Sequence, residues 1–567
     1  MKARRFAAFA TFALAAVVLG SHHPARAQTA PTPPAAEPTP TAIASPSPSA
    51  APGTSASAQP SETPTAGAPQ PNLAPTETPT QPPIIVDPRA AGVPIGGSQT
   101  LRVTQVLGTV IVTVADPTIA DVSIDQATRL LTIVGKKIGS TVVTVRDDRG
   151  LTRDVAVRVA YPAGTISDAA TIRITGRPAS AAFLRSSAID AALGHTTSRA
   201  GASAVATPED VTVNTSLPID DITTIDVPIT IPGGDSYFTV QGTTRVRVEN
   251  FAQPAIRPAS LLVSDFPETL KENGILFTAE LTAKASERFL YYHYNPATQP
   301  ERRIVLKVAN PSAEPALVQL ISGNAGPGLN EMEVGHLATQ RFLVRVAQNE
   351  GTVVSVPPGS TISLMAQGLP PKTTVSGLMQ IHEIDGAPLH LTLVAQNATD
   401  PIDGPIPTSA LLVGDRPHAR GIYPIPEFFF DYAYDTEGPE LEIPIGQIPL
   451  PNLVVGQTLA GDYGVLQSVT VRIVNNDRHN ARDIALYASP RGGRATGTFV
   501  IDRVLVQAHA MAPYGHYKLR QYTIAPGSFV RTEIVTMPEG GSSYPLRLIV
   551  APDDGSPAPG SPDSPIY

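Results

Sequence analysis

The chain has 567 residues and a formal net charge of −8, with 42% hydrophobic and 16% charged residues. This length and composition allow three or four domains with real hydrophobic cores. The acidic balance argues against nucleic-acid binding through a general positive field, and against general attraction to anionic lipid. Cysteine is absent, which excludes disulfides, zinc–thiolate centres, cysteine nucleophiles and a lipidated cysteine anchor.

The first 27 residues have the pattern of a secretory signal peptide. Basic residues occupy positions 2, 4 and 5, and an apolar run follows at 6–20. Ala25 and Ala27 place small side chains where a signal peptidase reads, so cleavage is predicted between Ala27 and Gln28. An uncleaved anchor is the alternative, but the run is shorter than the roughly 20 residues that span a bilayer. The mature chain is expected to have no transmembrane span.

Residues 28–90 are predicted to form a disordered spacer. Up to about residue 83 the segment consists mainly of Pro, Ala, Thr, Ser and Gln, with no Lys or Arg. Such a composition buries too little apolar surface to offset the entropy of ordering, and it favours extended polyproline conformations. A stalk that threads the cell wall or carries sugars on Ser and Thr is the alternative to a plain spacer.

Residues 91–162 alternate short apolar runs with turns, which predicts a small antiparallel β-sandwich. The stretches "VADPTIADVSI" and "LTIVGKKIGSTVVTVRDDRG" resemble the N-terminal domain of pilus-assembly secretins of the type II/type III secretion class. Bacterial Ig-like repeats share this cadence, so both families remain open. The secretin resemblance implies a periplasmic module that mediates assembly contacts. No secretin pore domain is recognisable after it, so a pore-forming role is not implied.

Residues 163–258 are predicted to form a small α+β domain. The stretch "SAAFLRSSAIDAAL" places apolar residues at helical spacing. Ser180 is expected to cap the start of this helix and Gly194 to end it.

A repeat follows. "LLVSDFPE" at 261–268 matches "LLVGDRPH" at 411–418, and later matches pair Asn310 with Asn475 and Gly359 with Gly527. The offset between matched positions grows along the chain, as loop insertions within two related domains would produce. Two β-sandwich units are therefore predicted, at 259–408 and 409–552, with a helical insertion near 334–351 in the first. Residues 553–567 are expected to be a disordered tail.

The two octets are interpreted as structural entrances to their units. In extended strands, Leu261 and Val263 share one face, as do Leu411 and Val413, and each pair is predicted to lie in the core of its own unit. Leu411→Ala is accordingly expected to cost roughly 2–5 kcal/mol. Asp265 and Asp415 are expected at the following turn, where they accept backbone N–H bonds and are not catalytic.

No catalytic motif is recognisable, and three weaker groups of residues remain. Tyr292 and Tyr294 share a strand face opposite His293, which fits a sugar-stacking strip or a half-buried aromatic strand. The acidic and aromatic run at 426–440 contains Asp431 and Asp435, which could serve carbohydrate chemistry or lie in a solvated loop. Scattered histidines do not form a metal pattern, so no metal site is predicted; they are His336, His382, His390, His509 and His516.

The sequence as a whole predicts a mainly β protein of tandem Ig-like or β-sandwich domains with one small α+β domain. We expect it to be exported to the periplasm or cell surface, without enzymatic activity or cofactor. Its expected role is structural, in assembly or in adhesion, with other envelope, pilus or secretion proteins as partners and cell-wall glycan as a further candidate. The alternative is a secreted carbohydrate-binding or carbohydrate-active protein, with Tyr292, Tyr294, Asp431 and Asp435 as candidate glycan contacts.

Overall fold

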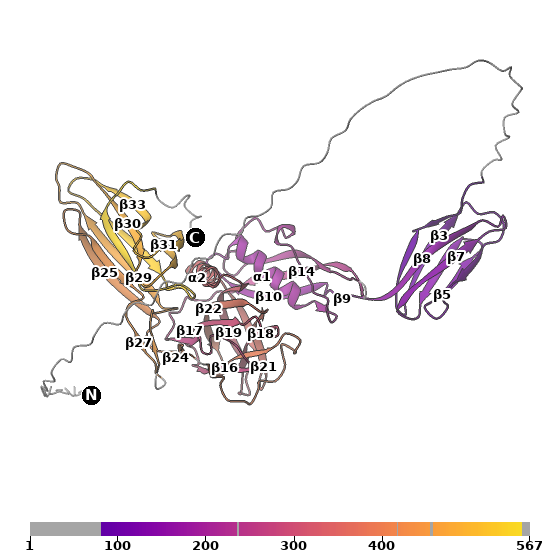
Figure 1. The fold of residues 1–567 in the computed structure, drawn as a ribbon, viewed down its shortest axis with the longest axis horizontal. Coiled ribbons are helices and arrows are strands. Elements are labelled where there is room, and N and C mark those ends of the chain that lie inside the picture. The colour runs from indigo at the N-terminus through magenta and orange to yellow at the C-terminus, as the bar shows by residue number, and fades with distance from the viewer. Residues whose placement is uncertain (1–80, 235–236, 415, 417, 454–456, 558–567) are drawn as a thin grey trace, which may run out of the picture. The chain divides into compact units, whose positions relative to one another are not determined.

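The computed structural model describes residues 81–234, 237–414, 416, 418–453 and 457–557. The predicted signal peptide, its cleavage site (Ala25, Ala27 and Gln28) and the spacer up to residue 80 lie outside the described residues. In the described part, strands β1–β35 dominate, and the α-helices are α1 (Ala181–Gly194) and α2 (Glu331–Gln348) (Figure 1). The prediction of a mainly β chain is confirmed.

The N-terminal sandwich consists of two sheets that share one core. One sheet has the order β1 (Ile85–Asp87), β3 (Ser98–Thr104), β6 (Leu130–Gly135), β5 (Ala120–Asp125). The other has the order β13 (Tyr237–Phe238), β8 (Thr152–Pro162), β7 (Gly139–Arg146), β4 (Ile111–Val114), and β2 (Ala90–Pro94) also pairs with β8. Alternate side chains point inward, so Leu131 and Ile133 meet Val155 and Val157 in the core. The predicted small β-sandwich is confirmed.

Ordered structure extends beyond the predicted spacer and tail boundaries. Ile84 and Val86 are 4% and 1% exposed, and β1 pairs antiparallel with β3. The spacer predicted for 28–90 therefore ends too late, because these two apolar side chains contribute to the core. At the other end, the ammonium of Lys518 forms an ion pair with Asp553, so the tail predicted for 553–567 begins with a residue that is held in place.

A nine-stranded sheet forms the centre of the following region. Its order is β12 (Ile222–Ile231), β14 (Val240–Asn250), β10 (Ala169–Thr175), β20 (Gly351–Val356), β19 (Ala316–Gly328), β22 (Thr373–Asp385), β17 (Ser286–Asn295), β15 (Ser260–Ser264), β24 (Arg420–Tyr423). The pairings β10–β20 and β15–β24 carry this one sheet across the predicted domain boundaries after 258 and 408.

Both helices cover this sheet. The helix α1 contacts β10, β12 and β14, and α2 contacts β19 and β22. The hydroxyl of Ser180 accepts the N–H of Phe183 at 3.2 Å, and α1 ends at Gly194, as the sequence predicted. The predicted helical insertion is α2, whose side chain Phe342 is fully buried.

Further sheets complete the two sandwich units. In the first unit, β16 (Gly274–Leu281), β23 (Leu389–Asn397), β18 (Arg302–Ala309) and β21 (Thr361–Leu369) pack against the nine-stranded sheet. The C-terminal sandwich has one sheet of β25 (Glu427–Asp435), β29 (Leu466–Val474), β34 (Phe529–Thr536), β31 (Ala495–Ile501) and β32 (Val504–Met511). Its other sheet has the order β26 (Leu441–Ile445), β35 (Leu546–Pro552), β30 (Arg482–Pro490), β33 (Tyr517–Ile524). Small hairpins add β9 (Gly164–Thr165) with β11 (Thr197–Ser198), and β27 (Leu450–Pro451) with β28 (Thr458–Leu459).

One turn recurs in both units where the sequence matched. Asn310 follows β18, and its backbone N–H donates to Ser360 O at 2.9 Å; Asn475 follows β29, and its N–H donates to Ser528 O at 2.9 Å. Both asparagine side chains are buried and donate to nearby backbone carbonyls. The same local structure therefore accompanies the matched residues, while the duplication of a whole domain stays a prediction.

The two octets differ in burial. Leu261 and Val263 are 0% and 1% exposed, as predicted, but Leu411 and Val413 are 40% and 72% exposed. The predicted burial of the second pair is wrong, which removes the basis for the large stability loss expected for Leu411→Ala.

The reason lies in the hydrogen bonding of each octet. The first four residues of the first octet lie in β15, which has a strand on each side, whereas the second octet contributes only an isolated bridge between Leu411 and Ile275 in the described part of the chain. Asp415 lies outside the described residues.

Candidate functional site: a cavity where the two octets meet

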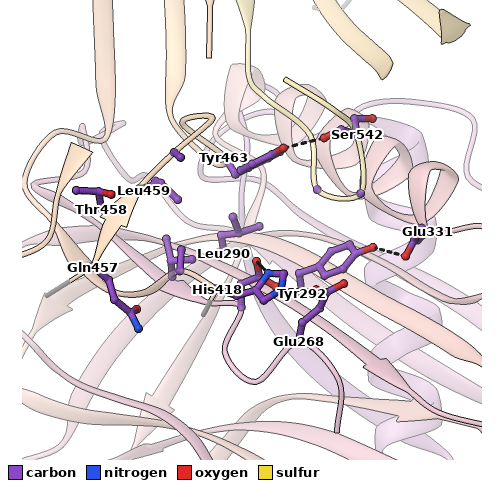
Figure 2. A pocket seen from close by; sticks show the side chains of 16 residues that line it. Glu268, Leu290, Tyr292, Glu331, His418, Gln457, Thr458, Leu459, Tyr463 and Ser542 are labelled. Atoms are coloured by element: carbon purple, nitrogen blue, oxygen red, sulfur yellow. Dashed lines mark hydrogen bonds and ion pairs between the residues drawn. The ribbon is translucent and has the colours of Figure 1, made fainter. Parts of the chain in front are cut away.

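A cavity of about 530 Å³ opens beside β15 and β17, where the two octets approach each other (Figure 2). Asp265 N–H donates to Ala419 O at 2.9 Å, so the chain after β15 runs alongside the chain that follows the second octet. The C-terminal sandwich region supplies the remaining wall. The lining side chains and backbone belong to Val263, Asp265, Glu268, Leu290, Tyr292, Glu331, His418, Ala419, Gln457, Thr458, Leu459, Ala460, Tyr463, Gly540, Gly541 and Ser542.

Three ionisable side chains from the octets meet at this cavity. His418 Nδ1 lies 3.4 Å from Asp265 Oδ2, and His418 Nε2 lies 2.9 Å from Glu268 Oε2. Glu268 and His418 are the last residues of the two octets, and Asp265 is the aspartate that the first octet carries. One ligand-type atom from each residue lies within 4.8 Å of the others. A second cavity, of about 260 Å³, shares Glu268 and His418 as lining residues.

Burial and charge set the protonation of this triad. Burial raises the pKa of Asp265 to about 6, against the opposing effects of its contact with His418 and of that residue's charge. The hydrogen bond with Asp265, together with the negative charges of Asp265 and Glu268, raises the pKa of His418. Asp265 Oδ1 is shielded from solvent and has no hydrogen-bond partner among the described residues. The site therefore contains a carboxyl oxygen that can still accept a hydrogen bond or bind a cation.

Tyrosine side chains surround the triad. Tyr292 Oη donates to Glu331 Oε2 at 3.3 Å, and Tyr463 Oη donates to Ser542 O at 2.8 Å (Figure 2). Tyr423 is fully buried, and its hydroxyl has no partner within the described ranges. Burial and, to a smaller extent, the charge of Asp265 raise the pKa of Tyr423 to about 12. The phenol thus stays neutral and able to donate a hydrogen bond.

The structure brings only one of the predicted glycan contacts to this cavity. Tyr292 lines it, but Tyr294, Asp431 and Asp435 do not. Both aspartates lie on the exposed face of the edge strand β25, and Asp435 accepts hydrogen bonds from Asn476 Nδ2 at 2.6 Å and from a following backbone N–H. Asp435 therefore holds a turn, and glycan contact by these residues stays a prediction.

The aromatic strand β17 is more buried than a half-exposed strip would be. Tyr291 and His293 are fully buried and Tyr292 is 6% exposed, because β17 lies inside the nine-stranded sheet. His293 Nδ1 contacts Pro267 O at 2.9 Å, and its Nε2 contacts Ser264 Oγ at 3.2 Å. His293 thus supports the first octet on the face opposite Tyr292.

Sequence reasoning did not identify the triad. His418 was absent from the scattered histidines considered for a metal, and Asp265 was expected to accept backbone N–H bonds. The signal was nevertheless in the repeated motif, because Glu268 and His418 both stand at its eighth position. The octets resemble each other mainly in their apolar residues, so the ionisable residue at the eighth position of each octet was not recognised as part of a site.

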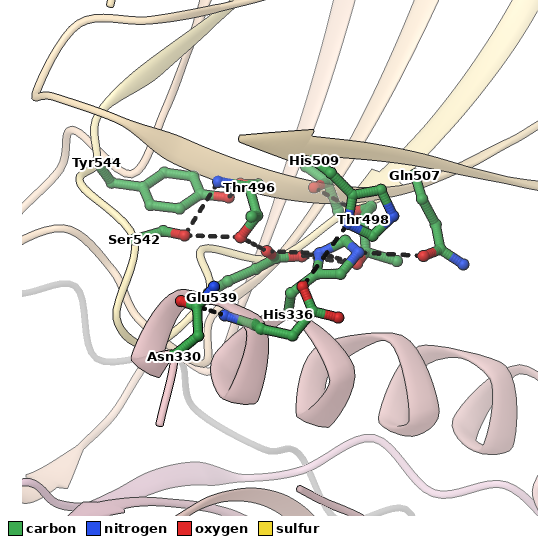
Figure 3. A network of polar contacts seen from close by, with 11 residues as sticks. Asn330, His336, Thr496, Thr498, Gln507, His509, Glu539, Ser542 and Tyr544 are labelled. Atoms are coloured by element: carbon green, nitrogen blue, oxygen red, sulfur yellow. Dashed lines mark hydrogen bonds and ion pairs between the residues drawn. The ribbon is translucent and has the colours of Figure 1, made fainter. Parts of the chain in front are cut away.

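A second polar cluster fastens α2 to the C-terminal sandwich (Figure 3). His336 Nδ1 lies 3.0 Å from Glu539 Oε2, and Glu539 Oε1 accepts the hydroxyl of Thr498 at 2.6 Å. His336 and Glu539 are both fully buried. Although burial opposes it, the contact with Glu539 raises the pKa of His336. Because each of these buried groups has a partner, the cluster is a structural tie between α2 and β31.

The close packing at this tie requires glycine. A Cβ atom on Gly335 would lie 1.7 Å from Gly540 O, so α2 approaches the backbone that also lines the cavity more closely than any side chain allows. The wall formed by Gly540 and Gly541 is thereby fixed against α2.

Comparison with known proteins gives one family match. Residues 87–160 match the family described as the pilus formation protein N-terminal region, which confirms the resemblance of residues 93–160 to a pilus-assembly module. No curated protein matches the chain. Within the described residues, no helix combines the length and apolar character needed to cross a membrane.

Solved structures resemble the chain only weakly. A tri-modular GH5 endo-β-1,4-glucanase from Bacillus licheniformis shows 12% identity over 30% of this chain and 38% of its own, with a TM-score of 0.12. The Bacteroides ovatus mixed-linkage glucan utilization protein SGBP-B shows 11% identity over 54% of this chain and 71% of its own, with a TM-score of 0.13. Protocadherin gamma B2 shows 11% identity over 34% and 57%, with a TM-score of 0.12. TM-scores this low carry no argument. The chain spans about two fifths of the length of the glucanase it matches.

Proposed function

We propose that the protein is an exported, non-enzymatic component of the cell envelope with a structural, assembly or adhesion role linked to pilus or secretion machinery. The observation that carries this proposal is the match of residues 87–160 to the pilus formation protein N-terminal region. The matched residues form the N-terminal β-sandwich. Its partners are other envelope proteins of the same machinery.

An exposed strand edge supports a role of this sandwich in assembly. The strand β4 pairs only with β7 among the described strands, so its other edge forms no backbone ladder with a described strand, although β5 of the second sheet lies close to β4. Ile111 on β4 is 57% exposed, and Leu107 in the preceding loop is 62% exposed. An exposed strand edge with apolar neighbours can pair with a strand of another chain, which is a common mode of protein recognition.

A charge placed on this edge tests the proposal. We expect Ile111→Asp in the full chain to weaken co-purification with pilus or secretion proteins from the native host at least several-fold, while the thermal unfolding profile stays unchanged. Ile222→Asp is the matched control, because Ile222 is 52% exposed on a strand outside the matched residues. If both variants co-purify with these proteins as well as the wild-type chain does, the strand edge no longer supports the proposed assembly role. Deletion of 84–162 without any loss of partners would reject the assembly role itself.

Carbohydrate binding is the second candidate, and one observation favours it. Tyr292 and Tyr463 line the same 530 Å³ cavity as the carboxylates of Glu268 and Glu331, and sugar sites combine aromatic surfaces with a few polar groups. Binding of soluble cell-wall fragments to the mature chain, measured by calorimetry and lost in Tyr292→Ala, is the expected result for this candidate. If none of these fragments gives a heat of binding, carbohydrate binding is excluded.

A further inference from the structure

We propose that Asp265, Glu268 and His418 bind a divalent transition-metal ion of the Zn²⁺ type, with an open coordination position toward the 530 Å³ cavity. This inference is independent of the proposed assembly role. It rests on the meeting of the two octets, whose ionisable residues are brought together from positions 150 residues apart in the case of Glu268 and His418.

The separations suit a metal centre. One ligand-type atom from each residue lies within 4.8 Å of the others, and His418 Nδ1 is 3.4 Å from Asp265 Oδ2. Two ligands bonded to zinc at tetrahedral angles lie roughly 3.3–3.6 Å apart, given metal–ligand bonds of about 2.0–2.2 Å. The Asp265–His418 edge already has this length. Glu268 Oε2 lies 2.9 Å from His418 Nε2, the other ring nitrogen, so the Glu268 carboxylate must swing toward the Nδ1 side to complete a three-residue ligand set.

The donor types select the class of ion. One imidazole nitrogen with two carboxylates suits Zn²⁺ and related transition metals, whereas Mg²⁺ and Ca²⁺ prefer oxygen donors alone. With His418 neutral, the triad carries two negative charges, which a divalent cation neutralises. Three protein ligands leave a position for water or a ligand, as in zinc sites that face a cavity.

A second observation, independent of the distances within the triad, is that buried polar atoms there have no hydrogen-bond partner among the described residues. Asp265 Oδ1 is shielded from solvent and has no partner among the described residues, and the same holds for the hydroxyl of Tyr423, whose side chain is 0% exposed. Asp265 is close enough for its charge to act on Tyr423. Buried polar groups in folded proteins are nearly always hydrogen-bonded, so the unpartnered carboxylate oxygen of Asp265 points to a polar species bound at the triad. A divalent cation supplies a partner for that oxygen.

The backbone holds the ligands in place. Asp265 N–H donates to Ala419 O at 2.9 Å, next to His418, and Glu268 O accepts Tyr294 N–H at 2.8 Å. Each ligand therefore stands on, or directly beside, a residue that is hydrogen-bonded to a neighbouring segment. Ligands on fixed backbone bind a metal with little loss of conformational freedom.

The test uses the tag-free mature chain, stripped with a chelator and titrated calorimetrically with Zn²⁺ alone. We expect one ion per chain, with Mg²⁺ and Ca²⁺ binding at least tenfold more weakly. His418→Ala and Asp265→Asn should each weaken Zn²⁺ binding at least tenfold. His390→Ala is the matched control, because His390 is exposed and lies outside the cavity, and it should leave binding unchanged.

A second measurement, thermal unfolding, distinguishes the loss of metal binding from the loss of the folded structure in a variant. Saturating Zn²⁺ should raise the midpoint of thermal unfolding of the wild-type chain and of His390→Ala, but not that of His418→Ala. Absence of stoichiometric Zn²⁺ binding by the wild-type chain overturns the proposal, and the triad is then an ion-paired histidine between two carboxylates. Unchanged Zn²⁺ affinity in His418→Ala overturns it as well.

Discussion

The octets at 261–268 and 411–418 share Leu-Leu-Val, an aspartate and a proline, yet they occupy different environments. Leu261 and Val263 are buried inside the nine-stranded sheet, while Leu411 and Val413 are largely exposed. Of the three apolar residues 411–413 in the second octet, only Leu412 is buried, at 8% exposed. Similar residues therefore form an interior strand of the sheet in one place and a segment beside another strand in the other.

The difference shows what decides burial. In β15 three successive residues, 261–263, are buried because both faces of the strand are covered: Leu262 packs into the core of the first unit, and Leu261 and Val263 pack into a second cluster. A segment joined to one neighbour by a single bridge buries only the side chain that points toward it. The local pattern predicted an extended conformation in both places, but which elements cover each face of a strand is decided by the whole fold.

The largest expected effect tests the first octet. Leu261→Ala should lower the free energy of unfolding by about 2–5 kcal/mol, because Leu261 is fully buried in a cluster with Tyr423 and Phe342. Urea unfolding followed by circular dichroism measures this loss. A loss under about 0.5 kcal/mol, as for a surface substitution, would contradict the burial of Leu261 in β15.

A pH effect sharpens the same comparison, since His293 supports only the first octet. Burial lowers the pKa of His293 from 6.5 to about 4, so the folded state keeps this ring neutral while the unfolded state binds a proton. The contribution of this residue to stability is therefore lost as the pH falls from about 6.5 to about 4, by about 3 kcal/mol in all.

The matched variant for that measurement is His293→Asn. Its side-chain amide can still donate to Pro267 O, which His293 Nδ1 contacts at 2.9 Å, but it does not titrate. Stability measured by urea unfolding between pH 4 and 7 should fall less steeply in the variant than in the wild-type chain. Parallel curves for the two proteins would show that His293 is not the group responsible.

Local sequence signals predicted much of the fold. Alternating apolar residues gave the sandwich at 91–162, and Ser180 and Gly194 marked the ends of α1, because capping and side-chain alternation are properties of neighbouring residues. The sequence did not predict that ordered structure already includes Ile84, because the many prolines around it indicated a disordered segment. The pairing of β15 with β24 could not be predicted, since it joins segments about 160 residues apart.

The candidate site was predictable only in part. Tyr292 was singled out from its aromatic strand, and it does line the cavity. Asp431 and Asp435 were singled out by composition, but they lie on an exposed strand face away from it. Asp265, Glu268 and His418 meet only after β15 and the chain before β24 run side by side, so no local pattern could bring them together.

A moderate effect is expected at the one buried leucine of the second octet. Leu412 packs into the core of the first unit, with its N–H donating to Ile275 O at 2.8 Å. Leu412→Ala should cost about 2 kcal/mol, at the lower end for buried leucines, because the side chain retains some exposure. The same urea titration measures it. A cost equal to that of Leu261→Ala would mean that the second octet is as deeply integrated as the first.

The smallest effect is expected at Leu411, and it separates the two interpretations of the repeat. Leu411 occupies the same place in its octet as Leu261, but its side chain is 40% exposed and, among the described residues, its backbone pairs only through the isolated bridge to Ile275. Replacing a half-exposed leucine removes few packing contacts, and the backbone bridge survives the change. Leu411→Ala should therefore alter the free energy of unfolding by no more than about 0.5 kcal/mol. If the loss instead reached about 2 kcal/mol, as for a buried leucine, the second octet would lie in a core as the sequence pattern alone predicts, and the two octets would be equivalent after all.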